Sequence, residues 1–314
     1  VSKWFRAIGA IAFALSFIGS APAAQSAGGG PGPEVCKSCH ADQYESYLAS
    51  SMSVKSDPRT PGAQGGCVVC HTANGDGTAH VKAGGGKGVG GIINPGSKTL
   101  ATDAKNKICL TCHQTGNRIN WQGSKHQAND VACTNCHSMH KDNGKDKVRV
   151  KITQPEVCFT CHKDKRAEIN RPSAHPIKEG KVACSDCHNP HGSAGPTLLV
   201  KTTLNETCYT CHTEKRGPLL YEHPPVREDC TNCHTPHGSI HTPLLKARIP
   251  WLCQGCHQAQ FHPSTVYSGL SLPVNPITGA RNFGSAQQVL ASGCENCHSQ
   301  IHGSHHPSGA RKTR

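Results

Sequence analysis

The sequence predicts a mostly irregular chain with short α-helices and little β-structure, held together by something other than an apolar core. Three observations support this fold class. Aromatic residues make up only 4% of the 314 residues, and the mean hydropathy is −0.49. The chain holds 33 Gly and 21 Pro, which interrupt long amphipathic elements. Its 20 cysteines all belong to one repeated pattern, Cys-x-x-Cys-His.

The first residues, VSKWFRAIGAIAFALSFIGSAPAA, are typical of a secretory signal peptide. Lys3 and Arg6 precede an apolar run from Ala7 to Ile18, and small residues follow at positions 21–23. The apolar run is about 12 residues long, whereas a membrane-spanning helix needs roughly 20. We therefore expect residues 1–24 to be a signal peptide and residues 25–314 to be an exported protein without a membrane helix of its own.

The Cys-x-x-Cys-His pattern occurs ten times, and no cysteine is left over. In chain order, motifs 1 to 10 span residues 36–40, 67–71, 109–113, 133–137, 158–162, 184–188, 208–212, 230–234, 253–257 and 294–298. Their cysteines are Cys36, Cys39, Cys67, Cys70, Cys109, Cys112, Cys133, Cys136, Cys158, Cys161, Cys184, Cys187, Cys208, Cys211, Cys230, Cys233, Cys253, Cys256, Cys294 and Cys297. Their histidines are His40, His71, His113, His137, His162, His188, His212, His234, His257 and His298.

This spacing indicates covalently bound haem c. Two thiols three positions apart reach the two vinyl groups of one haem as thioethers, and the adjacent histidine becomes the proximal iron ligand. Zinc sites, thioredoxin-like sites and disulfide frameworks also use cysteine pairs, but none of them requires a histidine next. Ten haems leave roughly 29 residues each, so the macrocycles replace the missing core.

The formal net charge of +13 would ordinarily suggest binding to nucleic acid or to an anionic membrane. Ten haems bring twenty propionates, and the lysines and arginines balance them. We therefore expect no nucleic-acid partner.

Motifs pair into five repeating units, because the clearest unit starts, Cys109, Cys158 and Cys208, lie about 50 residues apart. Units 1 to 5 hold motifs 1–2, 3–4, 5–6, 7–8 and 9–10. A mid-unit position, 11 to 13 residues after the first motif, carries His126, His175 and His223. A trailing position, three residues after the second motif, carries His140, His191 and His237. Looser copies are His262 and His302 in unit 5 and His80 in unit 1.

We interpret these nine recurring histidines as distal iron ligands. His241, His305 and His306 do not recur and are weaker candidates. Trans ligands of one haem need Cα atoms about 12 Å apart, whereas three residues extend at most about 10.8 Å. Each trailing histidine must therefore serve a haem other than that of its own motif, while the mid-unit histidines have enough chain to reach their own.

Met52 occupies the mid-unit position of unit 1. It lies 12 residues after His40, and it is one of only two methionines in the chain. Methionine packs almost anywhere, so a gap-filling side chain is one interpretation. The other is a sixth ligand, most simply of the motif 1 haem, whose potential a thioether would raise.

Long connections separate some motifs. Residues 84–96, GGGKGVGGIINPG, lack the Gly-Lys-Ser/Thr ending of a phosphate-binding loop, so we expect a flexible linker. Residues 258–293 form a second long connection that could contact a partner. The haem chain could divide into two five-haem halves, residues 25–170 and 171–314.

With these motifs in view, the chain resembles the periplasmic decahaem cytochromes of the MtrA/MtoA/DmsE type. The resemblance covers essentially all of residues 25–314. It is most specific in CSDCHNPHGS, CHTEKRGPLLYEHPPV and the ending CENCHSQIHGSHHPSG. It implies a multihaem cytochrome c fold around a linear chain of ten haem c groups, with mostly bis-histidine ligands. Where the family has histidine, this chain has Met52.

The resemblance also implies partners and a location. Family members thread an outer-membrane β-barrel porin and link periplasmic or inner-membrane electron-carrier cytochromes to an outer-surface multihaem cytochrome or an extracellular substrate. The reactions served are Fe(II) oxidation or Fe(III) and dimethyl sulfoxide respiration. A wire inside a porin also follows from physics, since irregular backbone cannot cross lipid unsheltered.

Two other functions remain open at this point. A multihaem reductase needs an open axial position, which nine distal histidines and Met52 do not leave, so we expect electron transfer instead of catalysis. A soluble periplasmic electron store would need the same haems but no porin.

Overall fold

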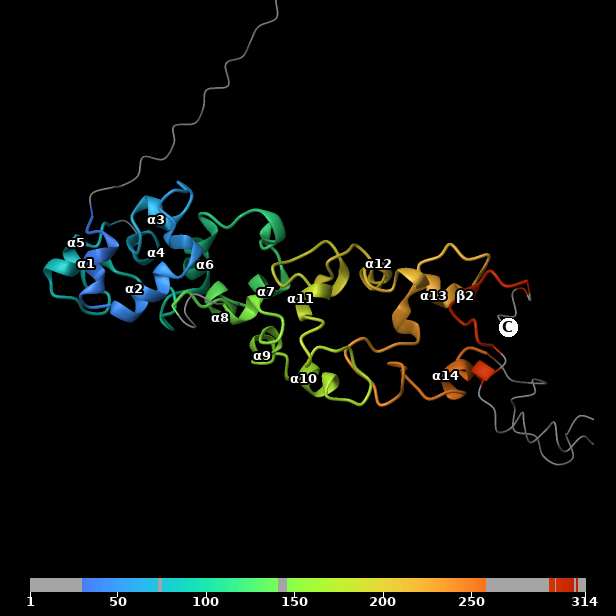
Figure 1. The fold of residues 1–314 in the computed structure, drawn as a ribbon. Coiled ribbons are helices and arrows are strands. Elements are labelled where there is room, and N and C mark those ends of the chain that lie inside the picture. Colours follow the sequence, from blue (N-terminus) through green and yellow to red (C-terminus); the bar gives the residue numbers. More distant parts are fainter. Residues whose placement is uncertain are drawn as a thin grey trace, which may run out of the picture.

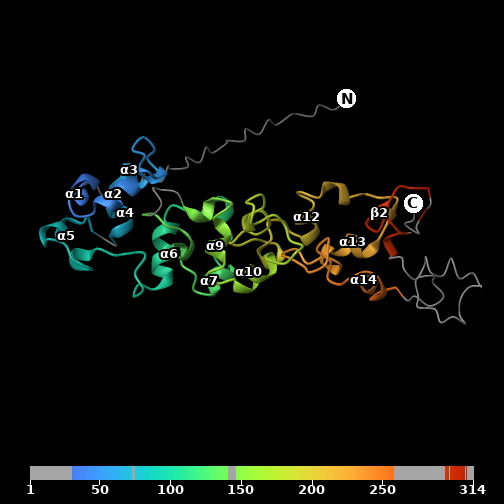
Figure 2. The same ribbon diagram turned by 60° about the horizontal axis from the view of Figure 1, so that its bottom comes forward.

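The structure is a computed structural model that describes residues 30–72, 75–140, 146–257, 294–296, 298–307 and 309. These residues form an elongated body in which the chain advances from one end to the other in sequence order (Figures 1 and 2). Helices α1 to α5 occupy one end, and α13, α14 and β2 occupy the other. The predicted signal peptide, Cys297 and the long connection with His262 lie outside the described residues.

Short helices make up most of the regular structure, as predicted. The α-helices are α1 (Pro33–Lys37), α2 (Ala41–Leu48), α3 (Pro61–Gln64), α4 (Val68–His71), α5 (Thr78–Lys82), α6 (Thr102–Leu110), α7 (Lys125–Ala128), α8 (Cys133–Cys136), α9 (Gln154–Cys158), α10 (Lys163–Ile169), α11 (Cys184–Cys187), α12 (Leu204–Cys208), α13 (Pro224–Glu228) and α14 (Trp251–Gln254). The 3-10 helices are η1 (Ser51–Ser53), η2 (Val89–Gly91), η3 (Gly116–Arg118), η5 (Lys147–Arg149), η6 (Pro196–Leu198), η7 (Thr213–Lys215), η8 (Cys230–Asn232) and η9 (Cys294–Asn296).

β-Structure among the described residues is limited to one antiparallel pair and some isolated bridges. Strand β1 (Tyr221–Glu222) pairs with β2 (Gly303–Ser304), with Tyr221 opposite Ser304. Since β1 belongs to unit 4 and β2 to unit 5, the pair joins two neighbouring units. This composition confirms the predicted fold class.

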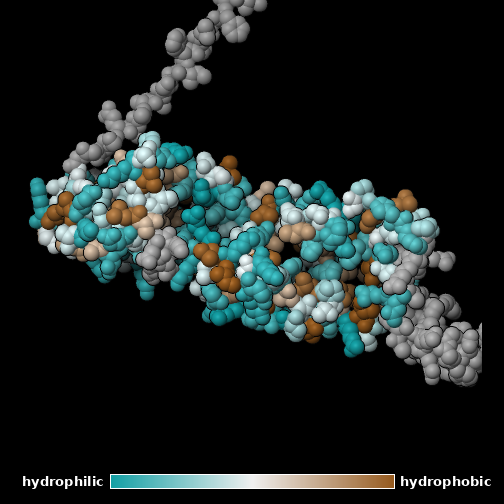
Figure 3. Space-filling view, viewed as in Figure 1, coloured by the Kyte–Doolittle hydropathy of each residue, from teal (hydrophilic) through white to brown (hydrophobic). Residues whose placement is uncertain are grey.

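Few apolar side chains are buried. The buried hydrophobic residues of the described segments are Tyr47, Trp121, Ala132, Phe159, Ile169, Ile177, Ala183, Leu199 and Leu245. Phe159, Ile169 and Ile177 form one small cluster, with Val182 packed against it. In Figure 3, hydrophobic residues lie in small separate patches among hydrophilic ones. Side chains alone therefore supply only a fraction of the core that a chain of this size ordinarily needs.

Buried amides fasten the two motifs of a unit together. Asn205, only 7% exposed, donates from Nδ2 to the carbonyls of Val226 and Arg227 at 3.0 and 2.9 Å. Its Oδ1 accepts from the N–H of Cys230 at 2.8 Å, at the start of motif 8. Asn106 makes the equivalent contact with the N–H of Cys133 at 2.8 Å. Each amide therefore fixes the distance between consecutive motifs.

Glycines allow neighbouring units to approach each other closely. A Cβ on Gly192 would lie 2.0 Å from the carbonyl oxygen of Asn120, and one on Gly238 would lie 2.0 Å from that of Glu168. Both glycines directly follow a trailing histidine, His191 or His237. The loop that carries each trailing histidine thus packs directly on the backbone of the preceding unit.

The glycine-rich segment at 84–96 does more than link two motifs. It contains η2, and a Cβ on Gly90 would lie 2.2 Å from the backbone nitrogen of His80 on α5. The carbonyls of Val89 and Ile93 accept hydrogen bonds from His80 and His71. The expectation of a linker was therefore incomplete, because the glycines permit a close contact that composition alone does not reveal.

No helix among the described residues is both long and apolar enough to cross a membrane.

We predict that Asn205→Ala lowers the free energy of unfolding of the holoprotein by about 2–3 kcal/mol, since it removes three hydrogen bonds of a buried amide, to the carbonyls of Val226 and Arg227 and from the N–H of Cys230. Denaturant unfolding followed through haem absorbance measures this. The matched control is Asn170→Ala, which removes one exposed hydrogen bond to Arg166 and should cost about 0.5 kcal/mol or less. Equal losses in the two variants would contradict a clamping role.

Candidate functional site

Each of the ten motifs forms one helical turn. The backbone N–H of every motif histidine donates to the carbonyl of the first motif cysteine at 2.8–3.1 Å. Residues three and four apart on such a turn share one face. Consequently both cysteines and the histidine point the same way before any cofactor is considered, as a single haem face requires.

Eight motif histidines face a second histidine across a constant gap. The pairs, motif histidine first, are His40–His80, His71–His140, His137–His191, His162–His126, His188–His237, His212–His175, His234–His302 and His257–His223. Their ring centroids lie 5.9–6.5 Å apart. An imidazole nitrogen binds a transition metal at about 2 Å, and the ring centre lies about 1 Å further, so two trans ligands are separated by roughly 6 Å. Each gap therefore fits one iron between two imidazoles.

The pairs follow one rule in units 2 to 5. A trailing histidine faces the second motif of the preceding unit, as His191 faces His137. A mid-unit histidine faces the first motif of the following unit, as His126 faces His162. The trailing histidines thus avoid their own motifs, as the three-residue spacing requires. The mid-unit histidines do not face the motif that precedes them, although the chain length would allow it.

Hydrogen bonds at Nδ1 explain these directions. Nδ1 of His126 donates to the carbonyl of Pro190, and Nδ1 of His175 donates to that of Pro236, both at 2.7 Å. Each proline directly precedes the trailing histidine of the next unit. These bonds turn the mid-unit rings toward that unit and leave Nε2 with the free lone pair, as metal ligation needs.

Motif histidines are oriented in the same way. The carbonyls of Thr197 and Pro243 accept from Nδ1 of His188 and His234 at 3.0 and 2.9 Å. Both acceptors lie nine residues beyond the motif histidine, and so does Asp146 beyond His137. These supporting groups were not predicted from the sequence. The recurring nine-residue spacing is the sequence signal that could have revealed them.

Carboxylates take the place of carbonyls beside the Nδ1 atoms of one motif histidine and one trailing histidine. Asp146 bonds Nδ1 of His137, and Glu168 lies 3.3 Å from Nδ1 of His237. A carboxylate acceptor makes an imidazole a stronger electron donor than a carbonyl does. Individual sites therefore differ in electronic character although their two ring ligands are alike.

Burial favours the neutral imidazole that ligation requires. Burial lowers the pKa of His191 to about 4, with a smaller contribution from His137. Burial is also the main cause of the lowered pKa of His140, His237 and His302. At neutral pH these rings carry a free lone pair and no charge.

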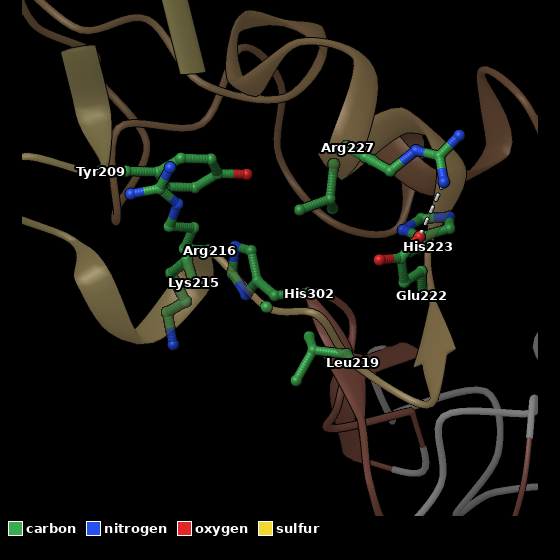
Figure 4. Close-up of a pocket in the computed structure, with 10 residues that line it drawn as sticks. Tyr209, Lys215, Arg216, Leu219, Glu222, His223, Arg227 and His302 are labelled. Atoms are coloured by element: carbon green, nitrogen blue, oxygen red, sulfur yellow. Dashed lines mark hydrogen bonds and ion pairs between the residues drawn. The ribbon is translucent and has the colours of Figure 1, made fainter. Parts of the chain in front are cut away.

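A pocket at the junction of units 4 and 5 shows the surroundings of two facing sites (Figure 4). His302 lies beside Lys215 and Arg216, and His223 lies beside Arg227 across the pocket. Cations at the rim suit the propionate groups of a haem, and the apolar side chains of Leu219 and Val226 suit its ring. The residues present therefore fit the cofactor that the motifs imply.

Neighbouring motif thiols form an unbroken series from motif 1 to motif 10. Thiols close enough to interact electrostatically are Cys36 with Cys67, Cys70 with Cys112, Cys109 with Cys133, Cys136 with Cys161, Cys158 with Cys184, Cys187 with Cys208 and Cys211, Cys208 with Cys230, Cys233 with Cys256, and Cys253 with Cys294. First cysteines interact within a unit, and between units the second cysteine of one motif interacts with the cysteines of the next motif. The motifs are therefore arranged in single file along the molecule.

Some predicted ligands are not paired by the described structure. His262 and Cys297 lie outside the described residues. The ring that lies opposite His40 is that of His80, so Met52 is not needed as the second ligand of motif 1. Nδ1 of His305 accepts a hydrogen bond from the N–H of Leu220 at 3.3 Å, which leaves the proton on Nε2 and disfavours ligation there.

Comparisons with known proteins find the same paired motifs. A family described as a doubled CXXCH motif matches residues 126–167, 175–217 and 223–262, and each match begins at a mid-unit histidine. The chain is 42% identical to the multihaem cytochrome MtrA of Shewanella baltica over 286 residues, 88% of this chain and 80% of the relative. It is 25% identical to the cytochrome c-type protein NrfB of Escherichia coli O6:H1 over 151 residues, 45% of this chain and 72% of that one.

We predict that Asp146→Asn raises the reduction potential of one haem and leaves its ligands in place. Loss of a charged acceptor at His137 weakens electron donation by about 1 kcal/mol, or about 40 mV for a one-electron couple. A spectroscopic redox titration measures the shift. Asp164→Asn is the control, because Asp164 pairs with Lys165 on the surface and bonds no histidine. An unchanged titration for Asp146→Asn would remove this role.

Proposed function

Because this chain belongs to the MtrA family of multihaem c-type cytochromes, we propose that it binds ten haem c groups and conducts electrons along its length across the outer membrane. Each motif would hold one haem through its two cysteines and its histidine. Bound haem iron exchanges single electrons, which is the chemistry that the cofactor supplies. The protein's part is to hold consecutive sites in order and at short range.

The single-file order of the motifs is the observation that supports conduction. The thiols of each motif interact with thiols of the next motif in the sequence, from the α1 end of the molecule to the α14 end. A storage protein has no need of a linear order, whereas a conductor does. The order also fixes two termini, one at each end of the long axis.

The distal ligands that we propose are the eight facing histidines together with His262 for motif 10. The eight facing histidines are His80, His126, His140, His175, His191, His223, His237 and His302. His262 occupies the looser mid-unit position of unit 5 in the sequence. With Met52 as the tenth distal ligand, every motif would have a partner, so we expect no substrate-binding iron and no enzymatic activity.

A β-barrel porin is the sheath that this chain would need. Ten sites spaced by about 10 Å exceed the roughly 40–45 Å of a bilayer with its head groups. The described residues are rich in irregular backbone, which lipid does not tolerate unless protein covers it. Inside a porin, the chain would link periplasmic carriers to extracellular donors or acceptors, such as ferrous iron, ferric minerals or dimethyl sulfoxide.

Proteoliposomes test the proposal. The cytochrome is reconstituted with a candidate porin around an enclosed redox dye, and reductant is added outside. We expect fast reduction of the dye only when cytochrome and porin are both present; porin alone and cytochrome alone are the controls. A rate no faster than that of porin alone would contradict conduction and favour an electron store.

Electron paramagnetic resonance tests the absence of a catalytic site. We expect the oxidised protein to show low-spin haem only, because every iron would have two axial ligands. Substantial high-spin five-coordinate haem would instead indicate an open site and a reductase.

A further inference from the structure

His113 is the exception among the first nine motif histidines. Each of the other eight faces a histidine ring, whereas the described residues place no histidine opposite His113. Motif 3 begins at the end of α6, between the two ends of the elongated body. The described residues thus leave one site within the series without an obvious second ligand.

The pairing rule identifies the residue that belongs there. Mid-unit residues of units 2, 3 and 4 face the first motif of the following unit: His126 faces His162, His175 faces His212, and His223 faces His257. By this rule, the mid-unit residue of unit 1 at position 52 should face motif 3, which is the first motif of unit 2. The mid-unit residue of unit 1 is Met52, so the rule places Met52 opposite His113.

Local structure supports the equivalence of Met52 and His126. Ser124 caps α7 and accepts from the N–H of Gln127, and His126 follows it by two residues. Ser50 caps η1 and accepts from the N–H of Met52, which again follows by two residues. Met52 is partly buried, and the hydroxyl of Tyr47 donates to its carbonyl at 3.4 Å. In both units, therefore, a capping serine lies two residues before the mid-unit residue, although the helical turn that follows is of a different type.

A compensating hydrogen bond marks the same place in the junction of units 1 and 2. In units 2 and 3, the mid-unit histidine donates from Nδ1 to the carbonyl that precedes the trailing histidine of the next unit. The corresponding carbonyl before His140 belongs to Met139, and methionine at position 52 has no side-chain N–H to offer. Instead, the largely buried hydroxyl of Ser46 donates to this carbonyl at 3.2 Å. A second side chain thus satisfies the acceptor that a histidine would have used.

Other candidate ligands are committed elsewhere. His80 and His140 face His40 and His71. His241 and His305 belong to units 4 and 5, and His305 is tied to Leu220 through Nδ1. Met139 is 38% exposed and directly precedes His140, whose ring faces motif 2. Among the described residues, Met52 is the one soft donor at the position that the rule requires.

We propose that the Sδ atom of Met52 is the axial ligand opposite His113, so that the third haem has histidine and methionine ligands. This inference rests on haem attachment at motif 3 and not on the porin. A thioether ligand stabilises ferrous iron and raises the potential relative to two imidazoles. The third position would then hold electrons longer than its neighbours, close to the N-terminal end of the series.

Absorption spectra of the oxidised holoprotein test the ligand. A methionine-ligated ferric haem gives a weak charge-transfer band at about 695 nm. We expect this band in the native protein and its loss in Met52→His, which keeps the haem low-spin and lowers the highest potential in the titration. Met139→Leu is the matched control and should keep the band. Absence of the band in the native protein, or its persistence in Met52→His, would overturn the proposal.

The His80→Ala variant tests which haem Met52 serves. Because His80 faces His40, we expect one five-coordinate high-spin haem to appear while the band at about 695 nm persists. If Met52 served motif 1 instead, removing His80 would open no haem, and that result would reject the assignment to motif 3.

The hydrogen bond of Ser46 provides a test that does not depend on spectra. In the native protein, Ser46→Ala strands the carbonyl of Met139 and should lower the melting temperature. In the Met52→His background, Nδ1 can donate to this carbonyl, so the same change should lower the melting temperature much less. Equal losses in both backgrounds would show that position 52 does not lie at this carbonyl.

The ligand and the conduit can fail separately. If the proteoliposome assay fails while the band at about 695 nm is present, only the proposed conduction through a porin is rejected.

Discussion

The structure depends on pairs of imidazole rings held about 6 Å apart, and in every described pair except His40–His80 the two rings come from consecutive units of the chain. A pair of this geometry is useful only if a metal lies between the rings, since two neutral imidazoles at that distance attract each other weakly. Each iron would therefore act as a cross-link between consecutive units, and the ten motifs would supply the cross-links that an apolar core usually provides. This explains how a chain with so few buried hydrophobic residues can keep an extended shape.

Supporting hydrogen bonds convert this requirement into a repeating assembly. The carbonyls of Pro190 and Pro236 each bind the mid-unit histidine of the preceding unit, and the adjacent trailing histidine faces another motif of that unit. One short loop thus sets two ligands. Gly192 and Gly238 allow the loop to reach the preceding backbone. Because the junctions of units 2–3 and 3–4 both use this loop, the order of the motifs in space there follows their order in the sequence.

Variation within the repeat is chemically informative. Asp146 and Glu168 place carboxylates behind His137 and His237, while backbone carbonyls serve His188 and His234. At the junction of units 1 and 2, Ser46 takes over the hydrogen bond that a mid-unit histidine makes elsewhere. A linear series of similar sites can in this way acquire a graded set of potentials without any change in its spacing.

The sequence by itself determined the cofactor chemistry, the five-unit repeat and the set of candidate ligands. These are local properties, because two cysteines and a histidine on one helical turn share a face whatever surrounds them. It also excluded each trailing histidine from its own motif, since three residues are too short to pass around a haem. The shortage of aromatic residues likewise indicated that the chain lacks a large apolar core.

Only the tertiary structure decided which histidine faces which motif. The direction of His126 is set by the carbonyl of Pro190, 64 residues away in sequence, and chain length alone would have allowed its own motif. Likewise, composition suggested a linker at 84–96, but the backbone of this segment orients His71 and His80. Position 52 was recognisable as unusual from the sequence, and the pairing of His40 with His80 is what leads us to propose motif 3 instead of motif 1 for Met52. Such contacts depend on how units dock, and a repeat pattern does not encode the direction of docking.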